Sequence, residues 1–245
     1  MVHQLTPETQ TPIIYPESDG QPMADNTQQF RWIVTIKENL EILFASVADV
    51  FVAGDLLWYP VEGNNKIRQA PDVMVVFGRP KGDRGSYQQW EENNITPQVV
   101  FEIISPGNRA KQMAEKLLFY QRYGVEEYYL YDPKKQELTG LQRIENWLEP
   151  IEQINGWVSP RLEIRFELTE TGLEIYRPDG QKFLTPVELD QFRQQEYQRA
   201  ENERQRAENE RQRAERAELE LEQQRQRAER LAEILRSQGI NPDEL

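Results

Sequence analysis

The sequence predicts an α/β domain with a mixed, partly parallel sheet flanked by helices, followed by a long charged helix. Three observations lead to this fold class. Short apolar runs, at 71–77 and 98–104 among others, have the length and composition of buried strands. The stretch 109–123, which precedes a further strand at 126–133, has helical periodicity, so a crossover connection is expected. From about residue 190 the chain is highly charged and repeats every seven residues.

The domain is expected to occupy residues 26–185, after a polar arm at 1–25 that is rich in Pro, Thr and Gln. The arm has neither a basic start nor an apolar stretch, so it does not resemble a signal peptide. Nowhere do about twenty apolar residues run together, as a membrane-spanning helix requires. The first helix is predicted to be capped by Asn26 or Thr27. Its apolar positions recur at helical spacing: Phe30, Ile33, Val34, Leu40, Leu43 and Phe44.

Strands and loops follow this helix. Residues 47–61 predict one or two strands around Gly54. The segment 78–97 is too polar and too rich in glycine to pack as an element, so it is expected to be an exposed loop. Gly124 is placed to end the second helix. From about 134 to 185, short alternating stretches predict a small antiparallel β annex.

The long helix is expected at residues 186–240, with 241–245 as a tail. RAENERQ occurs at 199–205 and again at 206–212, and one heptad position holds alanine or leucine throughout. If this is position a of a coiled coil, position d is charged in the first heptads, so a coiled coil there would be weak. Up to residue 212, a weak coiled coil and a solvated helix held by Glu–Arg pairs are equally compatible with the sequence. From Ala214 onward the pattern favours self-association or pairing with a partner, and a homodimer is expected.

Composition excludes several classes of site. The chain has no cysteine, which excludes disulfides, thiolate metal sites and cysteine nucleophiles and fits a reducing, cytoplasmic location. The only histidine, His3, lies in the arm, so a histidine triad or a zinc site of several histidines is excluded. Residues 191–245 contain 11 Arg and 13 Asp or Glu, so nearly all of the net charge of −13 belongs to the rest of the chain. A domain this acidic lacks the footprint of a general DNA-binding protein.

Two carboxylates stand at the apolar strands. Asp72 begins one strand, and Glu102 lies within another, where an unpaired charge is costly. If the strands are neighbours, the carboxylates can converge at one edge of the sheet, and they would repel each other unless a cation lay between them. Such oxygen ligands select Mg²⁺ or Mn²⁺, with the carbonyl of Ile103 as a further ligand. Lys116, on the following helix, could orient a metal-bound water or stabilise charge on a phosphate.

Each of these residues also has a structural interpretation. A Pro-Asp pair before a strand is a common turn, Glu102 could form a buried salt bridge with Lys116, and a helical lysine usually faces solvent. The set of three is more informative than any member. Basic residues of the 78–97 loop and the second helix are candidate phosphate contacts, with solvated charges as the alternative: Arg79, Lys81, Arg84, Arg109 and Lys111.

Several segments together resemble a known family. The Pro-Asp pair at 71–72, FEIISPGNR at 101–109, Lys116 and YGVEEYYLYDP at 123–133 are similar to the Uma-two family of restriction-endonuclease-like proteins, a branch of the PD-(D/E)xK nuclease superfamily. The resemblance covers about residues 12–150. It implies a restriction-endonuclease-like mixed sheet flanked by helices, with a bound Mg²⁺ or Mn²⁺.

The resemblance also implies roles for single residues. Asp72 and Glu102 would be metal ligands, and Lys116 would act from the helix, because the position where the superfamily often has its lysine is Ile104. Additional candidates are Asp55, on the preceding strand, and Glu38, where relatives sometimes have a helical acid.

One departure from the family pattern concerns Gln112. It stands where family members usually have Asp or Glu, four residues before Lys116. A neutral amide there could weaken the site.

The function predicted from these observations is a metal-dependent endonuclease that hydrolyses phosphodiester bonds in DNA. The alternative is a nuclease-fold binding module of weak or no activity, whose helical tail mediates oligomerisation or partner binding; Gln112 and the acidic charge favour it. A third interpretation is an oligomeric scaffold that works through residues 190–240 alone.

Overall fold

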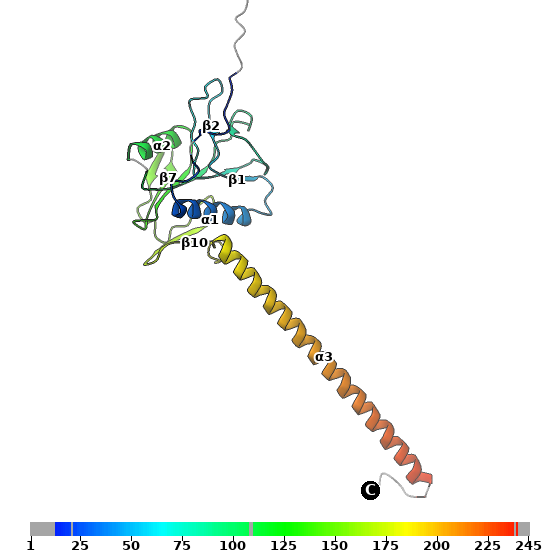
Figure 1. The fold of residues 1–245 in the computed structure, drawn as a ribbon. Coiled ribbons are helices and arrows are strands. Elements are labelled where there is room, and N and C mark those ends of the chain that lie inside the picture. The colour runs from blue at the N-terminus through cyan, green and yellow to red at the C-terminus, as the bar shows by residue number, and fades with distance from the viewer. Residues whose placement is uncertain (1–12, 21, 108–109, 238, 240–245) are drawn as a thin grey trace, which may run out of the picture. The chain divides into compact units, whose positions relative to one another are not determined.

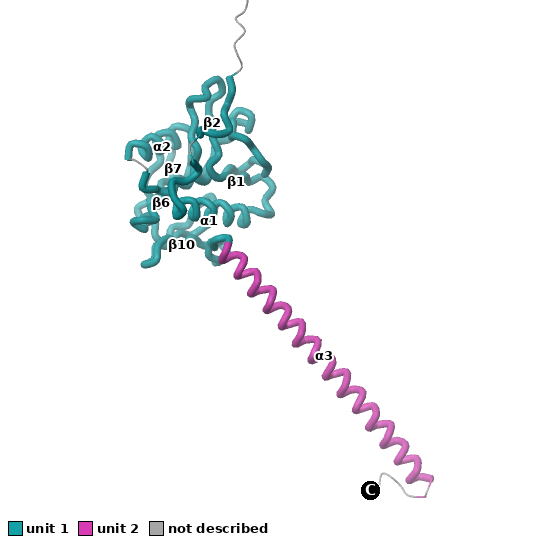
Figure 2. Tube along the Cα trace, in the orientation of Figure 1, with its two compact units in different colours: residues 1–186 teal, residues 187–245 magenta. Residues whose placement is uncertain are grey.

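The structure, a computed structural model, describes residues 13–20, 22–107, 110–237 and 239. The chain divides into two compact units, residues 1–186 and 187–245 (Figure 2). The first unit contains the sheets and two helices, and the second consists mainly of the long helix α3 (Pro186–Ser237). Within the described part of the chain, no helix combines the length and the apolar character needed to cross a membrane.

A six-stranded mixed sheet forms the centre of the first unit (Figure 1). Its strands, in spatial order, are β1 (Val50–Gly54), β3 (Val73–Phe77), β5 (Val99–Ile103), β6 (Glu127–Asp132), β7 (Glu137–Ile144) and β8 (Trp147–Pro150). β5 and β6 are parallel, and the other neighbours are antiparallel. The parallel pair is connected through α2 (Ala110–Arg122), which confirms the predicted crossover and the predicted fold class.

The helix α1 (Thr27–Leu43) covers one face of this sheet. Asn26 caps it as predicted, because its side chain accepts hydrogen bonds from the backbone N–H groups of the second and third helical residues, both at 2.9 Å. Ile33 and Leu40 are buried in the core. Phe30, predicted to face the core, is instead 48% exposed, because the buried stripe runs through Gln29, Ile33 and Leu40, one residue to its side.

The sheet is buried on both faces. Alternate residues of β1 and β3 belong to two hydrophobic clusters, one shared with α1 and the other with Tyr120 of α2. In the second cluster the ring of Trp58 stacks on that of Tyr120, with 6.4 Å between centroids and 1° between planes. Continuous apolar strands are what a doubly covered sheet requires, which explains why their sequences do not alternate.

The prediction of an exposed loop at 78–97 is wrong for part of the segment. The short strand β4 (Tyr87–Gln88) pairs in parallel with β2 (Trp58–Tyr59), and the Tyr87 side chain is buried. The Tyr87 hydroxyl donates a hydrogen bond to the Ile95 carbonyl at 2.7 Å. A polar segment can pack here because the Tyr87 side chain is inserted into the core with its polar atom satisfied.

The strands predicted as a β annex from residue 134 are antiparallel, but only some of them form a sheet of their own. β7 and β8 extend the main sheet, because Leu138 and Leu141 of β7 are buried and continue the two hydrophobic clusters. Only β9 (Arg165–Thr169) and β10 (Gly172–Tyr176) form a separate antiparallel pair.

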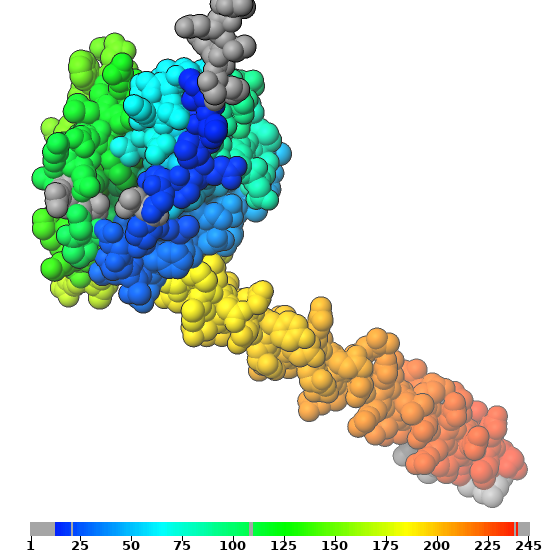
Figure 3. Space-filling model, turned by 45° about the horizontal axis from the view of Figure 1, so that its top comes forward, coloured from blue at the N-terminus to red at the C-terminus, as the bar shows by residue number. Residues whose placement is uncertain are grey.

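Part of the predicted polar arm is packed on the domain. We call residues 13–20 and 22–25 the N-terminal strap; Figure 3 shows it in dark blue on the surface beside the cyan and green segments. The ring of Tyr15 lies 5.2 Å from that of Tyr59 and 4.8 Å from that of Trp90. The Tyr59 hydroxyl also donates a hydrogen bond to the Pro16 carbonyl at 2.7 Å. His3 lies outside the described residues.

The helix α3 is described by itself. None of its described residues is buried. Ion pairs run along its surface, from Arg193 to Asp190, Arg199 to Glu196 and Arg211 to Glu215. These pairs suit a solvated helix, and self-association of its C-terminal half stays a prediction.

Candidate active site

The structure places Asp72 and Glu102 opposite one another. β3 and β5 pair with Val73 facing Phe101, so the residue before β3 faces Glu102. Both carboxylates are buried, at 6% and 2% exposure. The backbone N–H of Ile103 donates a hydrogen bond to Oδ2 of Asp72 at 2.6 Å. The strands are therefore neighbours, and the two side chains converge as the sequence predicted.

Two residues of α2 contact Glu102. Nζ of Lys116 lies 2.6 Å from Oε2, and the Tyr120 hydroxyl donates a hydrogen bond to Oε1 at 2.5 Å. The two side chains lie on one face of the helix because they are four residues apart. The ion pair explains in part how Glu102 is tolerated in an apolar strand, because the charge of Lys116 opposes the charge of Glu102. Tyr120 was not predicted as a partner of Glu102.

Asp72 and Glu102 share the positive charge of Lys116. Burial, and then the charge of Glu102, raise the pKa of Asp72 to about 7, although Lys116 and hydrogen bonds from Ile103 and Gln29 oppose the shift. Burial lowers the pKa of Lys116, but the charges of Glu102 and Asp72 outweigh it and raise the pKa overall. One lysine thus does not offset both carboxylates, and a further positive charge would stabilise the ionised pair.

Asp55 also belongs to this site. It follows β1 with a φ of 49°, a backbone conformation that aspartate tolerates better than most residues. Its pKa is raised, first by burial and then by the charge of Asp19, with a smaller contribution from Glu102, while Lys116 lowers it. The structure therefore brings this candidate beside Asp72, Glu102 and Lys116.

Asp55, Asp72 and Lys116 line a cavity of about 320 Å³, whereas Glu102 lies behind Lys116 and is not among the lining residues. The N-terminal strap forms one wall. Charged and amide residues that line the cavity include Asp19, Asp25, Gln29, Asp55, Asp72, Gln112 and Lys116. Among the lining residues that the structure describes, four aspartates thus face one lysine, so a polyanionic substrate would need additional cations here.

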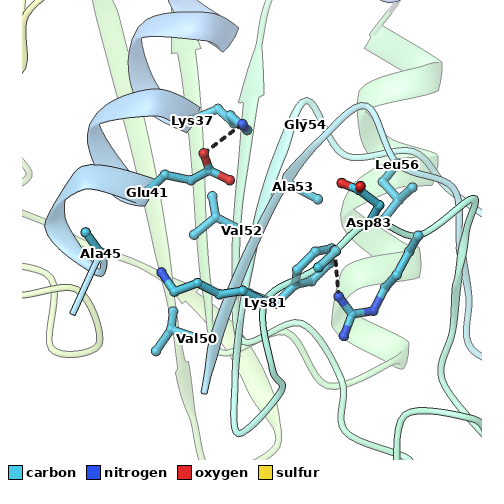
Figure 4. A pocket seen from close by; sticks show the side chains of 13 residues that line it. Lys37, Glu41, Ala45, Val50, Val52, Ala53, Gly54, Leu56, Lys81 and Asp83 are labelled. Carbon is cyan, nitrogen blue, oxygen red and sulfur yellow. Dashed lines mark hydrogen bonds and ion pairs between the residues drawn. The ribbon is translucent and has the colours of Figure 1, made fainter. Parts of the chain in front are cut away.

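A larger cavity, of about 530 Å³, lies along β1 (Figure 4). It is lined by Lys37, Glu41, Lys81 and Arg84 among others. Lys37 pairs with Glu41 at 3.0 Å, and the amino group of Lys81 donates to the Phe44 carbonyl at 2.6 Å. Because these cations already have partners, and the site acids lie elsewhere, this cavity is the less suitable site.

The helix α1 contributes a different residue from the one predicted. Glu38 pairs with Lys37 at 3.0 Å and does not line the 320 Å³ cavity. Gln29 does line it, is 6% exposed, and donates from Nε2 to the Ile103 carbonyl at 3.1 Å. The signal that sequence analysis missed was a polar residue in the buried stripe of an amphipathic helix.

The candidate phosphate contacts differ in their surroundings. Arg79 and Arg84 both pair with Glu92, at 2.5 and 2.6 Å, and are largely buried. Lys81 is bonded to a backbone carbonyl, as above, and Lys111 is exposed and 3.7 Å from Glu115. Arg109 lies outside the described residues. Binding of nucleic acid by these residues stays a prediction.

The oxygen atoms of the site fit a divalent cation only in part. Within the described ranges, no group of three or more His, Cys, Asp or Glu side chains is arranged to hold a metal ion. Asp72 and Glu102 supply two carboxylates, and the Ile103 carbonyl, which accepts one hydrogen bond from Gln29, keeps a second lone pair. Mg²⁺ is commonly bound by one or two carboxylates and completes its shell with water or substrate phosphate, so these donors fit the protein's part of such a shell.

Comparison with known proteins identifies a family, and solved structures that are similar to this chain. A crystal structure of a "putative nuclease belonging to DUF820" from Anabaena variabilis is 14% identical, covers 61% of this chain and 84% of that chain, and has a TM-score of 0.42. No curated protein matches the chain. The model of the Uma2 family, described as "Putative restriction endonuclease", matches residues 8–171, which is more than half of the sequence. The chain therefore belongs to the Uma2 family.

Proposed function

We propose that this protein is a metal-dependent endonuclease that hydrolyses phosphodiester bonds in DNA. The observation that carries the proposal is the buried pair of Asp72 and Glu102, which face each other on neighbouring strands, with the amino group of Lys116 on Glu102 and a cavity lined by Asp72 and Lys116. Membership of a family described as "Putative restriction endonuclease" supports a nuclease-like function and DNA as the partner.

The residues of the site have separable roles in this proposal. Asp72, Glu102 and the Ile103 carbonyl would hold Mg²⁺ or Mn²⁺, which when bound would polarise the phosphate and lower the pKa of a water. The amino group of Lys116 can turn from Glu102 to donate a hydrogen bond to a phosphate oxygen. Tyr120 keeps its bond to Oε1 meanwhile, so the orientation of Glu102 is retained.

The proposal is tested by cleavage of plasmid DNA by the full chain. Cleavage is expected with Mg²⁺ or Mn²⁺ and is expected to stop with EDTA, and Glu102→Gln should reduce the rate by about 100-fold or more, the scale on which removing one electrostatic group acts. Glu127→Gln is the matched control, because Glu127 is a buried glutamate of β6 whose hydrogen-bond partners are Tyr129, Ser159 and the Arg161 N–H rather than residues of the site. Cleavage without metal, or cleavage that survives Glu102→Gln, would contradict the proposal.

A second candidate is a DNA-binding or partner-binding module without catalysis. The observation that favours it is that Lys116 and Tyr120 already satisfy both oxygens of Glu102. In that case calorimetry would detect no Mn²⁺ binding to the wild type. Loss of Mn²⁺ binding in both Asp72→Asn and Glu102→Gln would instead favour the nuclease.

We further propose that α3 forms a homodimer through its C-terminal half. Leu221 and Leu231 occupy the heptad seam and are exposed in the single chain. Replacing both by glutamate is expected to convert a dimer into a monomer of 29.0 kDa, measured by light scattering. Leu219→Glu is the control, because Leu219 is equally exposed but lies away from the seam. The same mass in the wild type and the double variant would contradict dimerisation here.

A further inference from the structure

Gln29 is a buried amide on the apolar face of α1, and it makes hydrogen bonds that packing against the sheet does not require. It belongs to the stripe of α1 that packs on the sheet, where its neighbours Ile33, Ile36 and Leu40 are apolar. A buried amide is tolerated only where its donors and acceptor find partners, so an apolar residue would be the simpler choice for packing alone. The partners of Gln29 are therefore informative.

Each end of the Gln29 amide has a distinct partner. Nε2 donates to the Ile103 carbonyl at 3.1 Å, and the amide lies close enough to the Asp72 carboxylate to lower its pKa. Oε1 accepts from the backbone N–H of Asp25, in the N-terminal strap, at 2.8 Å. A carbonyl and a carboxylate can only accept, and a backbone N–H can only donate. The amide is thus fixed in one orientation.

The geometry points to Gln29 as a positioning residue of the proposed active site, which holds the Asp72 carboxylate and the Ile103 carbonyl in place and joins them to the N-terminal strap. The role in metal binding rests on the proposed function, whereas the connection between the strap and Asp72 does not. Asp25 belongs to the cavity wall, so its hydrogen bond to Gln29 links the wall to the groups that would bind the cation. If the strap were released, Oε1 of Gln29 would lose the hydrogen bond from the Asp25 N–H, and the side-chain amide of Gln29 could rotate.

Asn39 provides a matched control on the same helix. It is also a fully buried amide, and its Nδ2 donates to the carbonyls of Thr35 and Leu184, both at 2.7 Å. It has no part in the cavity. Asn39→Leu and Gln29→Leu therefore both remove a buried amide from α1, and only the second removes contacts to Asp72 and Ile103.

The first measurement is the affinity of the full chain for Mn²⁺ by calorimetry, at a temperature where every variant is folded. Gln29→Leu is expected to lower the affinity by about tenfold or more, as the loss of outer partners of metal ligands commonly does, and Asn39→Leu to leave it unchanged. Gln29→Glu keeps the acceptor for the Asp25 N–H but replaces the Nε2 donor by an oxygen that faces the Ile103 carbonyl, so it is also expected to lower the affinity. Unchanged affinity in both Gln29 variants, or an equal loss in Asn39→Leu, would overturn the inference.

The second measurement needs no metal. Amide hydrogen exchange by NMR should be at least about tenfold faster for the Asp25 and Ile103 N–H groups in Gln29→Leu than in the wild type, and unchanged in Asn39→Leu. If the wild type binds no Mn²⁺, the proposed function fails and this measurement still decides on the positioning role. Unchanged exchange at both groups in Gln29→Leu would overturn it.

Discussion

Lys116→Met is expected to lower the free energy of unfolding by about 3–5 kcal/mol, because it leaves a buried carboxylate without its opposing charge. Glu102 is almost fully buried, and its other hydrogen bond, from Tyr120, is neutral. Methionine has a similar length and fills the same space, so the loss reports on charge rather than on packing. The measurement is urea denaturation of the metal-free protein at pH 8.

Two comparisons separate this effect from a general loss of a lysine. Lys111→Met, on the same helix, should change the free energy of unfolding by less than about 1 kcal/mol, because its side chain is 85% exposed. Combining Lys116→Met with Glu102→Gln should recover much of the stability, since residue 102 then carries no charge. If Lys116→Met costs no more than Lys111→Met, the ion pair does not hold Glu102.

The metal-free protein is expected to lose stability as the pH rises from about 4 to about 7, by up to about 4 kcal/mol from Asp72 alone. The unfolded chain releases the Asp72 proton near 3.8, whereas burial and the charge of Glu102 keep it bound in the folded state up to about 7. The folded state therefore binds more protons within this window, and the free energy of unfolding falls with rising pH. Lys116 and the hydrogen bond from the Ile103 N–H lower the pKa of Asp72, so without them the loss of stability with rising pH would be larger.

Asp72→Asn tests the assignment. Asparagine keeps an oxygen that can accept from the Ile103 N–H and carries no charge, so the variant should be more stable than the wild type at pH 8 and should lose less stability between pH 4 and 7. Asp132→Asn, another buried aspartate at the end of β6, leaves Asp72 intact and should keep the pH dependence of the wild type. An equal dependence in Asp72→Asn would show that another group is responsible.

Local pattern was sufficient for the elements that build the sheet. The apolar runs at β3 and β5, the periodicity of α1 and α2, and the cap at Asn26 are properties of neighbouring residues, and the structure has them where the sequence predicted them. β4 was missed because it is two residues long and lies in a polar segment. Its pairing with β2 depends on residues about thirty positions away, which no local pattern reports.

The candidate site, too, could be predicted from the sequence only where its residues lie on neighbouring strands. Asp72 and Glu102 could be placed together because neighbouring strands fix their distance. Gln29 and Tyr120 could not be identified as their partners, because each reaches the acids from a helix whose rotation depends on tertiary packing. The packing of the strap was missed for a similar reason, since Tyr15 is held by Tyr59 and Trp90, far along the chain.

The strap also determines where a shortened protein can begin. A chain started at α1 would keep the sheet, both acids and Lys116, and would fold around the same core. It would lack Asp19 and Asp25 of the cavity wall and the Asp25 N–H that holds Gln29. Binding or cleavage measured on such a fragment would describe a wider and less acidic site than that of the full chain. The match to the family model, which covers residues 8–171, includes the strap.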